Sequence, residues 1–550
     1  MKARIEALET IAGNSFDLCI IGGGATGAGC ALDAQLRGLK TVLVDGGDFA
    51  SAASSASTKL VHGGVRYLEQ AVKKLDVGEY RMVQAALRER IHMLKNAPHL
   101  AHAAEFLVPV FSRAQAIYYQ IGMKMYDWIA GKDNLFPSRF LPRAEALRRM
   151  PALRADRLHG AVSYSDGQFD DSRYDLSLVQ TFTEGGGEAL NYARVIGFAK
   201  DKAGKLTSAT LRDSFSGGGF SIQARAFVNA TGPASDAIRL MASPNAARRL
   251  RPSKGVHILF SLEEFRSADA LLVPKTEDGR VIFAVPWMGR LLVGTTDDEA
   301  TPETKMVVLR EEAEYLLRQL NPYLGKPLRV EQVVSGLAGL RPLVAAGAGH
   351  GTKQLIRDHE VEVDEQSGLI SILGGKWTTH RLMAEDTINA VQKSIGSGHT
   401  VSVTKEHLLV GAKGFSIDYW KMLLAEYHLE EATARHLAQK FGTRAPDVLE
   451  LTRTNAAHGK YLVAGLPYLR AEVVYAIRQE MAQTVEDILA RRLGLQMFDW
   501  RKSLEAAPAV GDLLAAELGW EQKNRDEAVA AYGEKITGFL RTLGLTENAA

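Results

Sequence analysis

The sequence predicts an α/β protein in which one sheet domain is assembled from distant segments, a second sheet domain is inserted into it, and an α-helical domain follows. Three observations lead to this prediction. Residues 16–29 run from an apolar strand through a glycine turn into a helix. Residues 226–232 and 369–380 repeat the passage from an apolar strand to a turn of small residues. From about residue 400 onward such turns become scarce, and long amphipathic helical patterns replace them.

The first strand and turn carry the spacing of a dinucleotide-binding site. Gly22, Gly24 and Gly27 form the pattern G-x-G-x-x-G, which lets the backbone turn sharply and approach a pyrophosphate. The helix that follows directs its N-terminal N–H groups and the positive end of its dipole at those phosphates. A second strand, at residues 41–44, ends at Asp45, where a carboxylate accepts hydrogen bonds from a ribose. Strand, turn, helix and acid together predict a Rossmann-like domain.

The positions of these segments divide the chain into domains. The dinucleotide-binding domain takes about residues 14–90, 166–249 and 336–395. The segments at about 91–165 and 250–335 build the inserted domain, where the strand-like runs 281–285 and 291–294 indicate a sheet. Residues 396–550 form the helical domain, with long helices expected at 471–492 and 524–541.

Composition and charge restrict the class of protein. At 550 residues the chain is too long for one hydrophobic core. Its 66 basic and 64 acidic residues leave a net charge of +2, so no global field favours nucleic acid. Cys19 and Cys30 are expected to be packed thiols of a reducing compartment, not a disulfide. No signal peptide, membrane-spanning helix or metal site is expected, because the sequence offers none of their patterns.

A longer set of motifs resembles one enzyme family. Together with the opening fingerprint, residues 51–69 resemble the FAD-dependent glycerol-3-phosphate dehydrogenases of bacteria and mitochondria. The resemblance continues in consistent order at residues 164–171, 230–233, 294–297, 340–342, 356–358, 374–379 and 465–468, and it spans roughly residues 15–545. The chain has no EF-hand loop like that in the calcium-binding extension of the mitochondrial members, so it resembles the bacterial type. At Asp45 the family usually has Glu, but the shorter acid still reaches a ribose.

The resemblance implies a fold and a reaction. It implies an FAD-dependent oxidoreductase region over residues 14–395, made of an FAD-binding Rossmann-like domain with an inserted antiparallel-sheet substrate domain, and a C-terminal α-helical domain. The implied reaction is the oxidation of sn-glycerol 3-phosphate to dihydroxyacetone phosphate, with hydride transfer to flavin N5 and electrons passed to a quinone. The FAD is expected to be non-covalent.

The resemblance also indicates how the substrate phosphate is held. Arg341 and Arg357 are implied as a clamp, because a guanidinium fork donates two parallel hydrogen bonds to a phosphate. Arg66 and Tyr67 are expected close to the same pocket. Arg341 stands between Leu340 and Pro342 in an apolar, glycine-rich stretch, which is unusual for a surface ion-pair partner.

Two further residues are assigned to the chemistry. His257, on a strand that enters the inserted domain, is the favoured general base, against the alternative of a satisfied core histidine. Lys376 follows a Gly-Gly turn and is a candidate to stabilise the reduced flavin, against the alternative of a surface lysine. His62 is assigned to the surroundings of the flavin. The expected cofactor-binding residues are Gly22, Gly24, Ala25, Thr26, Gly27, Asp45, Ser55, Ser57, Thr58, Lys59, His62, Gly63, Gly64, Ala230, Thr231, Gly232, Gly375, Lys376, Trp377 and Thr378.

Three other functions stay open at this stage. A glycerol-3-phosphate oxidase would share the fold and substrate but would use O2 and produce H2O2. An amine or amino-acid oxidase needs one arginine for a carboxylate, whereas the paired Arg341 and Arg357 favour a phosphate. A flavoprotein that serves only as a binding module is disfavoured, because the phosphate clamp and the candidate base are both present.

Transfer of electrons to a quinone requires contact with a bilayer. Since no spanning helix is expected, the resemblance implies peripheral attachment at the cytoplasmic side of the bacterial inner membrane, on an anionic lipid surface. Residues 113–132 mix aromatic, Met and Ile residues with flanking basic ones. This pattern suits either a membrane interface or a helix packed on the inserted domain. The sequence leaves the oligomeric state open, with a homodimer as one alternative.

Overall fold

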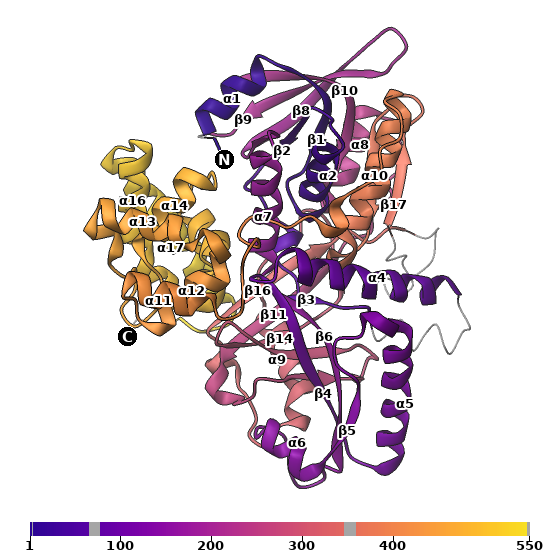
Figure 1. Cartoon of the computed structure of the whole chain (residues 1–550), viewed down its shortest axis with the longest axis vertical. Coiled ribbons are helices and arrows are strands. Elements are labelled where there is room, and N and C mark those ends of the chain that lie inside the picture. Colours follow the sequence, from indigo (N-terminus) through magenta and orange to yellow (C-terminus); the bar gives the residue numbers. More distant parts are fainter. Residues whose placement is uncertain (3, 65–76, 346–358, 547–550) are drawn as a thin grey trace.

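The computed structural model describes residues 1–2, 4–64, 77–345 and 359–546. In Figure 1 one sheet with its helices occupies the upper part of the molecule, a second sheet lies below it, and the C-terminal helices stand to the left. The α/β fold with a C-terminal helical domain is therefore confirmed.

The first sheet is mainly parallel and lies in the dinucleotide-binding domain. Its strand order is β17–β18–β10–β1–β2–β7, with β8 and β9 as an antiparallel extension beside β10. Apart from β17 with β18, the neighbours on this path run parallel. The strands are β1 (Ser15–Ile21), β2 (Thr41–Val44), β7 (Glu188–Leu190), β8 (Ala193–Lys200), β9 (Leu206–Asp213), β10 (Gly219–Asn229), β17 (His359–Val363) and β18 (Ile370–Gly374).

Helices cover this sheet, which explains why β1 and β2 are apolar along almost their whole length. The covering helices are α1 (Arg4–Ala12), α2 (Ala25–Leu36), α7 (Asp171–Glu184), α8 (Ser235–Ala242) and α10 (His380–Ile395). Cys19 on β1 and Cys30 on α2 are buried free thiols, and burial raises the pKa of each to about 12. The expectation of packed thiols is confirmed.

The second sheet belongs to the inserted domain. Its strand order is β15–β11–β14–β13–β12–β4–β6–β3, with β16 beside β11 and β5 beside β6. Among the described strands of this sheet, β12 and β4 form the one parallel pair, and the other pairs are antiparallel. The strands are β3 (Leu60–Val61), β4 (Ala101–Val110), β5 (Arg139–Pro142), β6 (Gly160–Phe169), β11 (Ser253–Ser261), β12 (Ala270–Val273), β13 (Ile282–Trp287), β14 (Arg290–Gly294), β15 (Asp298–Glu299) and β16 (Ser335–Arg341). Helices α4 (Val77–Asn96), α5 (Arg113–Ala130), α6 (Arg143–Arg149) and α9 (Arg310–Leu320) accompany it.

The domain boundaries defined by the two sheets differ from the boundaries predicted from the sequence. β3 falls in the predicted segment 14–90 and β16 in 336–395, yet both pair within the second sheet. β6 crosses the predicted boundary between 165 and 166. The reason is that the chain passes between the sheets several times, and only hydrogen-bond pairing decides to which sheet a short strand belongs.

The C-terminal domain is helical. Its helices are α11 (Tyr419–Tyr427), α12 (Glu431–Phe441), α13 (Ala445–Thr454), α14 (Arg470–Gln479), α15 (Leu495–Phe498), α16 (Trp500–Leu518) and α17 (Gln522–Thr542). The prediction at 524–541 is confirmed by α17. The single helix predicted at 471–492 is wrong, because α14 ends at Gln479 and Met481 adopts a positive φ of 52°. A separate π-helical turn, η12 (Asp487–Arg492), follows. No helix in the described parts of the chain is long and apolar enough to cross a membrane.

Candidate active site

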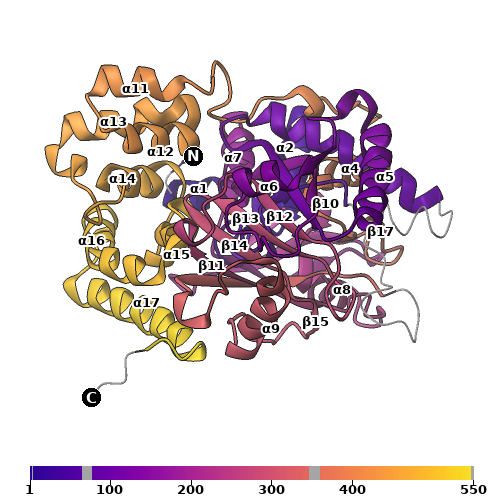
Figure 2. The same cartoon turned by 90° about the horizontal axis from the view of Figure 1, so that it is seen from below.

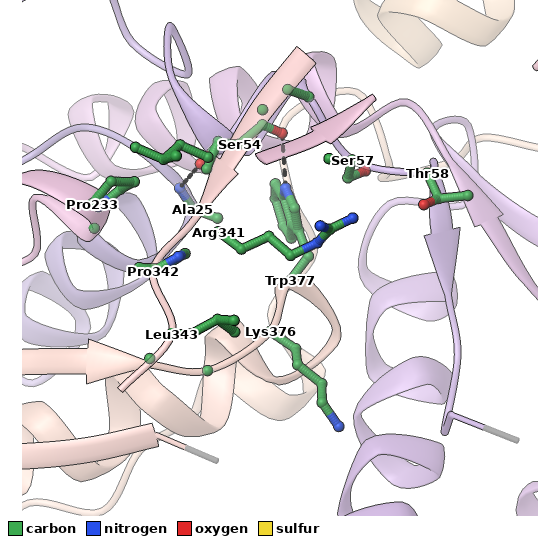
Figure 3. A pocket seen from close by; sticks show the side chains of 18 of the residues that line it. Ala25, Ser54, Ser57, Thr58, Pro233, Arg341, Pro342, Leu343, Lys376 and Trp377 are labelled. Atoms are coloured by element: carbon green, nitrogen blue, oxygen red, sulfur yellow. Dashed lines mark hydrogen bonds between the residues drawn. The ribbon is translucent and has the colours of Figure 1, made fainter. Parts of the chain in front are cut away.

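A cavity of about 1620 Å3 is lined by residues of both sheets, and Figure 3 shows part of it from close by. Most residues selected from the sequence meet here, although they come from segments hundreds of positions apart. The predicted residues that line the cavity are Gly22, Gly24, Ala25, Thr26, Asp45, Ser57, Thr58, His62, Gly64, Ala230, Thr231, Gly232, His257, Arg341, Gly375, Lys376, Trp377 and Thr378.

Four predicted cofactor residues lie behind the cavity wall. Gly27 packs on the first turn, where an added Cβ would stand 1.7 Å from the carbonyl oxygen of Gly22. Gly63 is enclosed by Leu87 and the Tyr126 hydroxyl. Ser55 and Lys59 do not line the cavity either, and the Lys59 ammonium forms a buried ion pair with Asp171. These residues shape or support the wall and do not line the cavity itself.

Three predicted substrate residues, Arg66, Tyr67 and Arg357, lie outside the described residues. Among the described residues, no group of three or more His, Cys, Asp or Glu side chains is arranged to hold a metal ion.

The first glycine turn has the form of a pyrophosphate cradle. Gly22 has a φ of +109°, and an added Cβ would lie 2.6 Å from the carbonyl oxygen of Ala230, so only glycine fits. The Gly24 position opens on the cavity, with the Ser54 hydroxyl 2.6 Å from an added Cβ. Gly24, the N-cap of α2, provides no side-chain cap, and Ser54 Oγ instead accepts a hydrogen bond from Ala25 N at 2.9 Å.

Asp45 lies at the end of β2, at the edge of the same cavity. Its carboxylate oxygens accept hydrogen bonds from Gly23 N at 2.6 Å and from Gly47 N at 2.7 Å. Burial raises the pKa of Asp45, and the two backbone bonds act in the opposite direction. The carboxylate is thereby held between the first turn and the loop that follows β2.

Arg341 ends strand β16 and extends its side chain along the cavity wall (Figure 3). The guanidinium Nη1 donates to the carbonyl oxygen of Thr296 at 3.1 Å and to Asp297 Oδ1 at 3.2 Å, and Nη2 donates to Thr295 Oγ1 at 2.8 Å. A Cβ added at Gly255 would lie 2.3 Å from Nη2, so this glycine makes room for the fork. The arginine is therefore held in one orientation with 28% of its side chain exposed, which suits an anion-binding group.

His257 lies on β11 and is 2% exposed. Its Nε2 is 2.9 Å from Thr58 Oγ1, and its Nδ1 is buried without a hydrogen-bond partner among the described residues. Burial lowers the pKa of His257 well below its ordinary value, and the charges of Arg341 and Lys59 lower it further. The imidazole is neutral in this site, which is the form that accepts a proton, although its basicity is weak.

Lys376 and Trp377 follow the Gly-Gly turn after β18. The Lys376 ammonium lies 3.4 Å from Met82 Sδ on α4. The Trp377 indole donates to the carbonyl oxygen of Ser54 at 2.9 Å (Figure 3). This bond ties the third strand-to-glycine turn to the segment after β2, so two distant segments form one wall.

The sequence prediction missed Ser54, Thr295 and Asp297. The last two belong to a motif at residues 294–297 that was noted without assigning its side chains. Ser54 belongs to a serine-rich run in which only the 3-10 turn at Ala53–Ser55 decides that Ser54, and not Ser55, faces the cavity.

Comparison with known proteins places the chain in a family. Residues 17–387 match the family model of FAD dependent oxidoreductases, and residues 402–525 match the C-terminal domain of alpha-glycerophosphate oxidase. The probable mitochondrial glycerol-3-phosphate dehydrogenase of Caenorhabditis elegans is 43% identical over 536 residues, which cover 96% of this chain and 73% of that protein. The mitochondrial glycerol-3-phosphate dehydrogenase of Homo sapiens is 40% identical over 525 residues, covering 94% and 72%. The chain belongs to the FAD-dependent glycerol-3-phosphate dehydrogenase family.

One solved structure agrees with this assignment to the family, and a second shares the fold. The glycerol-3-phosphate dehydrogenase from Bacillus halodurans, solved in complex with FAD, has a TM-score of 0.79 and 30% identity, covering 98% of this chain and 97% of that chain. The L-alpha-glycerophosphate oxidase of Mycoplasma pneumoniae, with a TM-score of 0.55 and 16% identity, shares the fold, over 71% of this chain and 96% of that chain. FAD is the cofactor of the family, and the glycine turn, the N-terminus of α2 and Asp45 fit its pyrophosphate and ribose.

Proposed function

We propose that this protein oxidises sn-glycerol 3-phosphate to dihydroxyacetone phosphate and passes the electrons to a quinone. One observation supports the proposal above the others: the Arg341 fork and the neutral His257 share one cavity with the FAD-type glycine turn. When bound, FAD supplies the two-electron acceptor for the hydrogen at C2 of the substrate.

Arg341 binds the substrate phosphate in this proposal. Its guanidinium is held by Thr295, Thr296 and Asp297, so little rotamer entropy is lost when an anion binds. Arg357, Arg66 and Tyr67 are proposed to complete the phosphate site, on the resemblance of their motifs alone.

His257 accepts the proton of the substrate hydroxyl in this proposal. The positive charge of Arg341 contributes to the low pKa of His257. A phosphate dianion at Arg341 offsets that charge and raises the pKa of the imidazole, so substrate binding itself makes His257 a better base. Lys376, on the same cavity, is proposed to stabilise negative charge on the reduced cofactor.

A quinone as acceptor is supported by the composition of the cavity on the side of the inserted domain. There the wall is formed mainly by apolar side chains of α5, β12 and β13. These include Tyr118, Ile121, Met123, Met125, Leu272 and Phe283. An apolar wall suits a quinone ring better than it suits a second polar substrate. The alternative is an oxidase that reduces O2, and the yield of H2O2 per turnover separates the two.

Peripheral membrane attachment is proposed through α5. This helix exposes Ile117, Tyr118, Ile121 and Trp128 by 60%, 52%, 58% and 76%. Exposed aromatic and aliphatic residues on one amphipathic helix suit the boundary between headgroups and acyl chains. We place the protein at the cytoplasmic side of a bacterial inner membrane, with an anionic surface as the partner of its basic residues.

Anaerobic mixing of the purified protein with glycerol 3-phosphate tests the proposal. The flavin absorbance near its visible maximum should bleach, a quinone analogue should restore it, and NAD should have no effect. Bleaching without any response to a quinone, together with stoichiometric H2O2 in air, would favour the oxidase. Failure to bleach with glycerol 3-phosphate would refute the substrate assignment.

A further inference from the structure

A buried cluster outside the cavity connects the C-terminal domain to the loop that follows β2. At its centre is Asp48, which is 1% exposed. Asp48 Oδ2 accepts hydrogen bonds from Arg491 Nε and Arg492 Nη1, each at 2.6 Å. Asp48 Oδ1 accepts from Arg492 Nη2 at 2.8 Å and from Asn191 Nδ2 at 3.0 Å. Four donors therefore satisfy this carboxylate, and three of them come from the C-terminal domain.

The local structure of η12 brings two consecutive arginines to one carboxylate. The turn is closed by a bond from Leu493 N to the carbonyl oxygen of Ile488 at 2.8 Å, in the π-helical pattern. Arg491 Nη2 also donates to Asp487 Oδ1 at 2.5 Å, and Arg492 Nη2 donates to the carbonyl oxygen of Glu480 at 2.7 Å. π-helical turns are rare in proteins, and those that occur often lie at functional sites. Contacts other than those with Asp48 therefore also fix the orientation of both arginine side chains.

The loop that carries Asp48 borders the cavity through Asp45, Gly47 and Ala50. Asp45 Oδ1 accepts from Gly47 N, the residue before Asp48, and Asp45 Oδ2 accepts from Gly23 N. Ala50 N donates to the carbonyl oxygen of Gly23 at 3.0 Å. The short loop 45–50 therefore joins Asp48 both to the carboxylate expected at the ribose and to the first glycine turn.

This loop owes its defined shape to contacts that include the ion pairs of Asp48 and backbone bonds from Tyr192 N and Ala193 N, at 2.8 and 2.7 Å. Gly46 and Gly47 give it a high conformational entropy in the unfolded chain, so its order must come from contacts. A carboxylate as buried as that of Asp48 is stable only when it is paired. The attraction of Arg491 and Arg492 holds the pKa of Asp48 well below its usual range. Loss of the arginine pair would leave a buried, unpaired carboxylate within this loop, three residues from Asp45.

We propose that Arg491 and Arg492 are positioning residues for the FAD site. Through Asp48 they hold the loop 45–50 in the shape that presents Asp45 to the FAD ribose. The C-terminal helices, which lie along one side of both sheets in Figure 2, therefore take part in retaining the cofactor. This role concerns FAD binding alone and is independent of the proposed substrate and electron acceptor.

The test compares two variants of the full-length protein. Arg492→Met removes two of the four bonds to Asp48. Arg290→Met is the matched control, because Arg290 Nε donates to the carbonyl oxygen of Phe498 at 2.7 Å and joins β14 to the same C-terminal domain without a bond to residues 45–50 or to Arg492. For each protein we would measure the dissociation constant of FAD on the refilled apoprotein and the hydrogen exchange of the peptide that covers residues 45–51. Both measurements are made below the unfolding transition.

For Arg492→Met we expect the dissociation constant of FAD to rise about tenfold. This is the increase expected if the loop adopts its binding conformation in only about a tenth of the molecules. Amide exchange in residues 45–51 should become faster, whereas Arg290→Met should leave both quantities near wild type. Unchanged FAD affinity in Arg492→Met overturns the proposal, and so does an equal loss in both variants. If Arg492→Met does not fold, Arg492→Lys replaces it, since lysine keeps the charge but loses the fork, and a smaller change in the same direction is expected.

Discussion

Replacement of Arg341 by lysine tests the proposed phosphate site most directly. Lysine keeps the positive charge, but its ammonium is a point charge and cannot reproduce the planar fork. In the structure the fork is held by three hydrogen bonds, to Thr295, Thr296 and Asp297. A lysine at this position therefore loses both the fixed orientation and one of two parallel bonds to the phosphate.

The expected magnitude follows from the bond that is lost. A hydrogen bond to a charged group contributes about 1.5–3 kcal/mol, which corresponds to a decrease of roughly 10- to 150-fold in kcat/KM for glycerol 3-phosphate. Since the phosphate is remote from the reacting carbon, most of the loss should appear in KM, with a smaller part in kcat from misplacement of C2. FAD content and thermal stability should hardly change.

Two further variants sharpen this assay. Gly255→Ala keeps Arg341 but places a Cβ 2.3 Å from its Nη2, so it should displace the fork and raise KM as well. Arg249→Lys changes an arginine that pairs with Glu360 and Glu362 and does not line the cavity, so kcat/KM should stay near wild type. Steady-state kinetics with a quinone analogue measures all three. If Arg341→Lys sheds its flavin, or loses the same activity on unphosphorylated glycerol, Arg341 is structural and the reasoning fails.

Three other predictions concern the cofactor, the membrane and pH. Gly24→Val should give apoprotein, because the first turn leaves no room for a side chain beside the Ser54 hydroxyl and the pyrophosphate. Full FAD occupancy after purification would contradict the assignment of this turn as the pyrophosphate site. Ile121→Glu should reduce cosedimentation with anionic vesicles several-fold. The control Ile417→Glu, at a residue 80% exposed on the C-terminal domain, should not reduce it. Equal binding of both variants would exclude α5 as the attachment site. His99 is buried and its pKa is lowered from 6.5 to about 3, mainly by burial. Below pH 6.5 this histidine binds a proton in the unfolded chain but not in the native state. The free energy of unfolding therefore decreases as the pH is lowered, by roughly 1.5 kcal/mol from pH 6.5 to pH 5 for this one group. Urea unfolding of His99→Gln should lack this part of the pH dependence, and an unchanged slope would show that His99 does not cause it.

The local sequence was sufficient to predict the structure wherever neighbouring residues decide it. The passage from β1 through Gly22, Gly24 and Gly27 into α2 could be predicted, because the steric demands of a tight turn lie within a dozen residues. The strands β13 and β14 and the helix α17 were predicted from their apolar periodicity for the same reason. The break between α14 and η12 was missed, since it depends on a positive φ at Met481 and on contacts of Asp487 with distant residues.

The sequence by itself determined that a Rossmann-like strand–turn–helix unit opens the chain, which residues carry the motifs of one family, and that a helical domain follows. Only the tertiary structure decided how these parts meet. It placed Ser54, and not Ser55, at the N-terminus of α2, enclosed His257 beside Thr58, and closed Arg491 and Arg492 on Asp48 more than 440 positions away. The physical reason is that turns and periodicity arise from steric and solvation effects between near neighbours, whereas burial, ion pairing and pKa depend on groups that folding alone brings together.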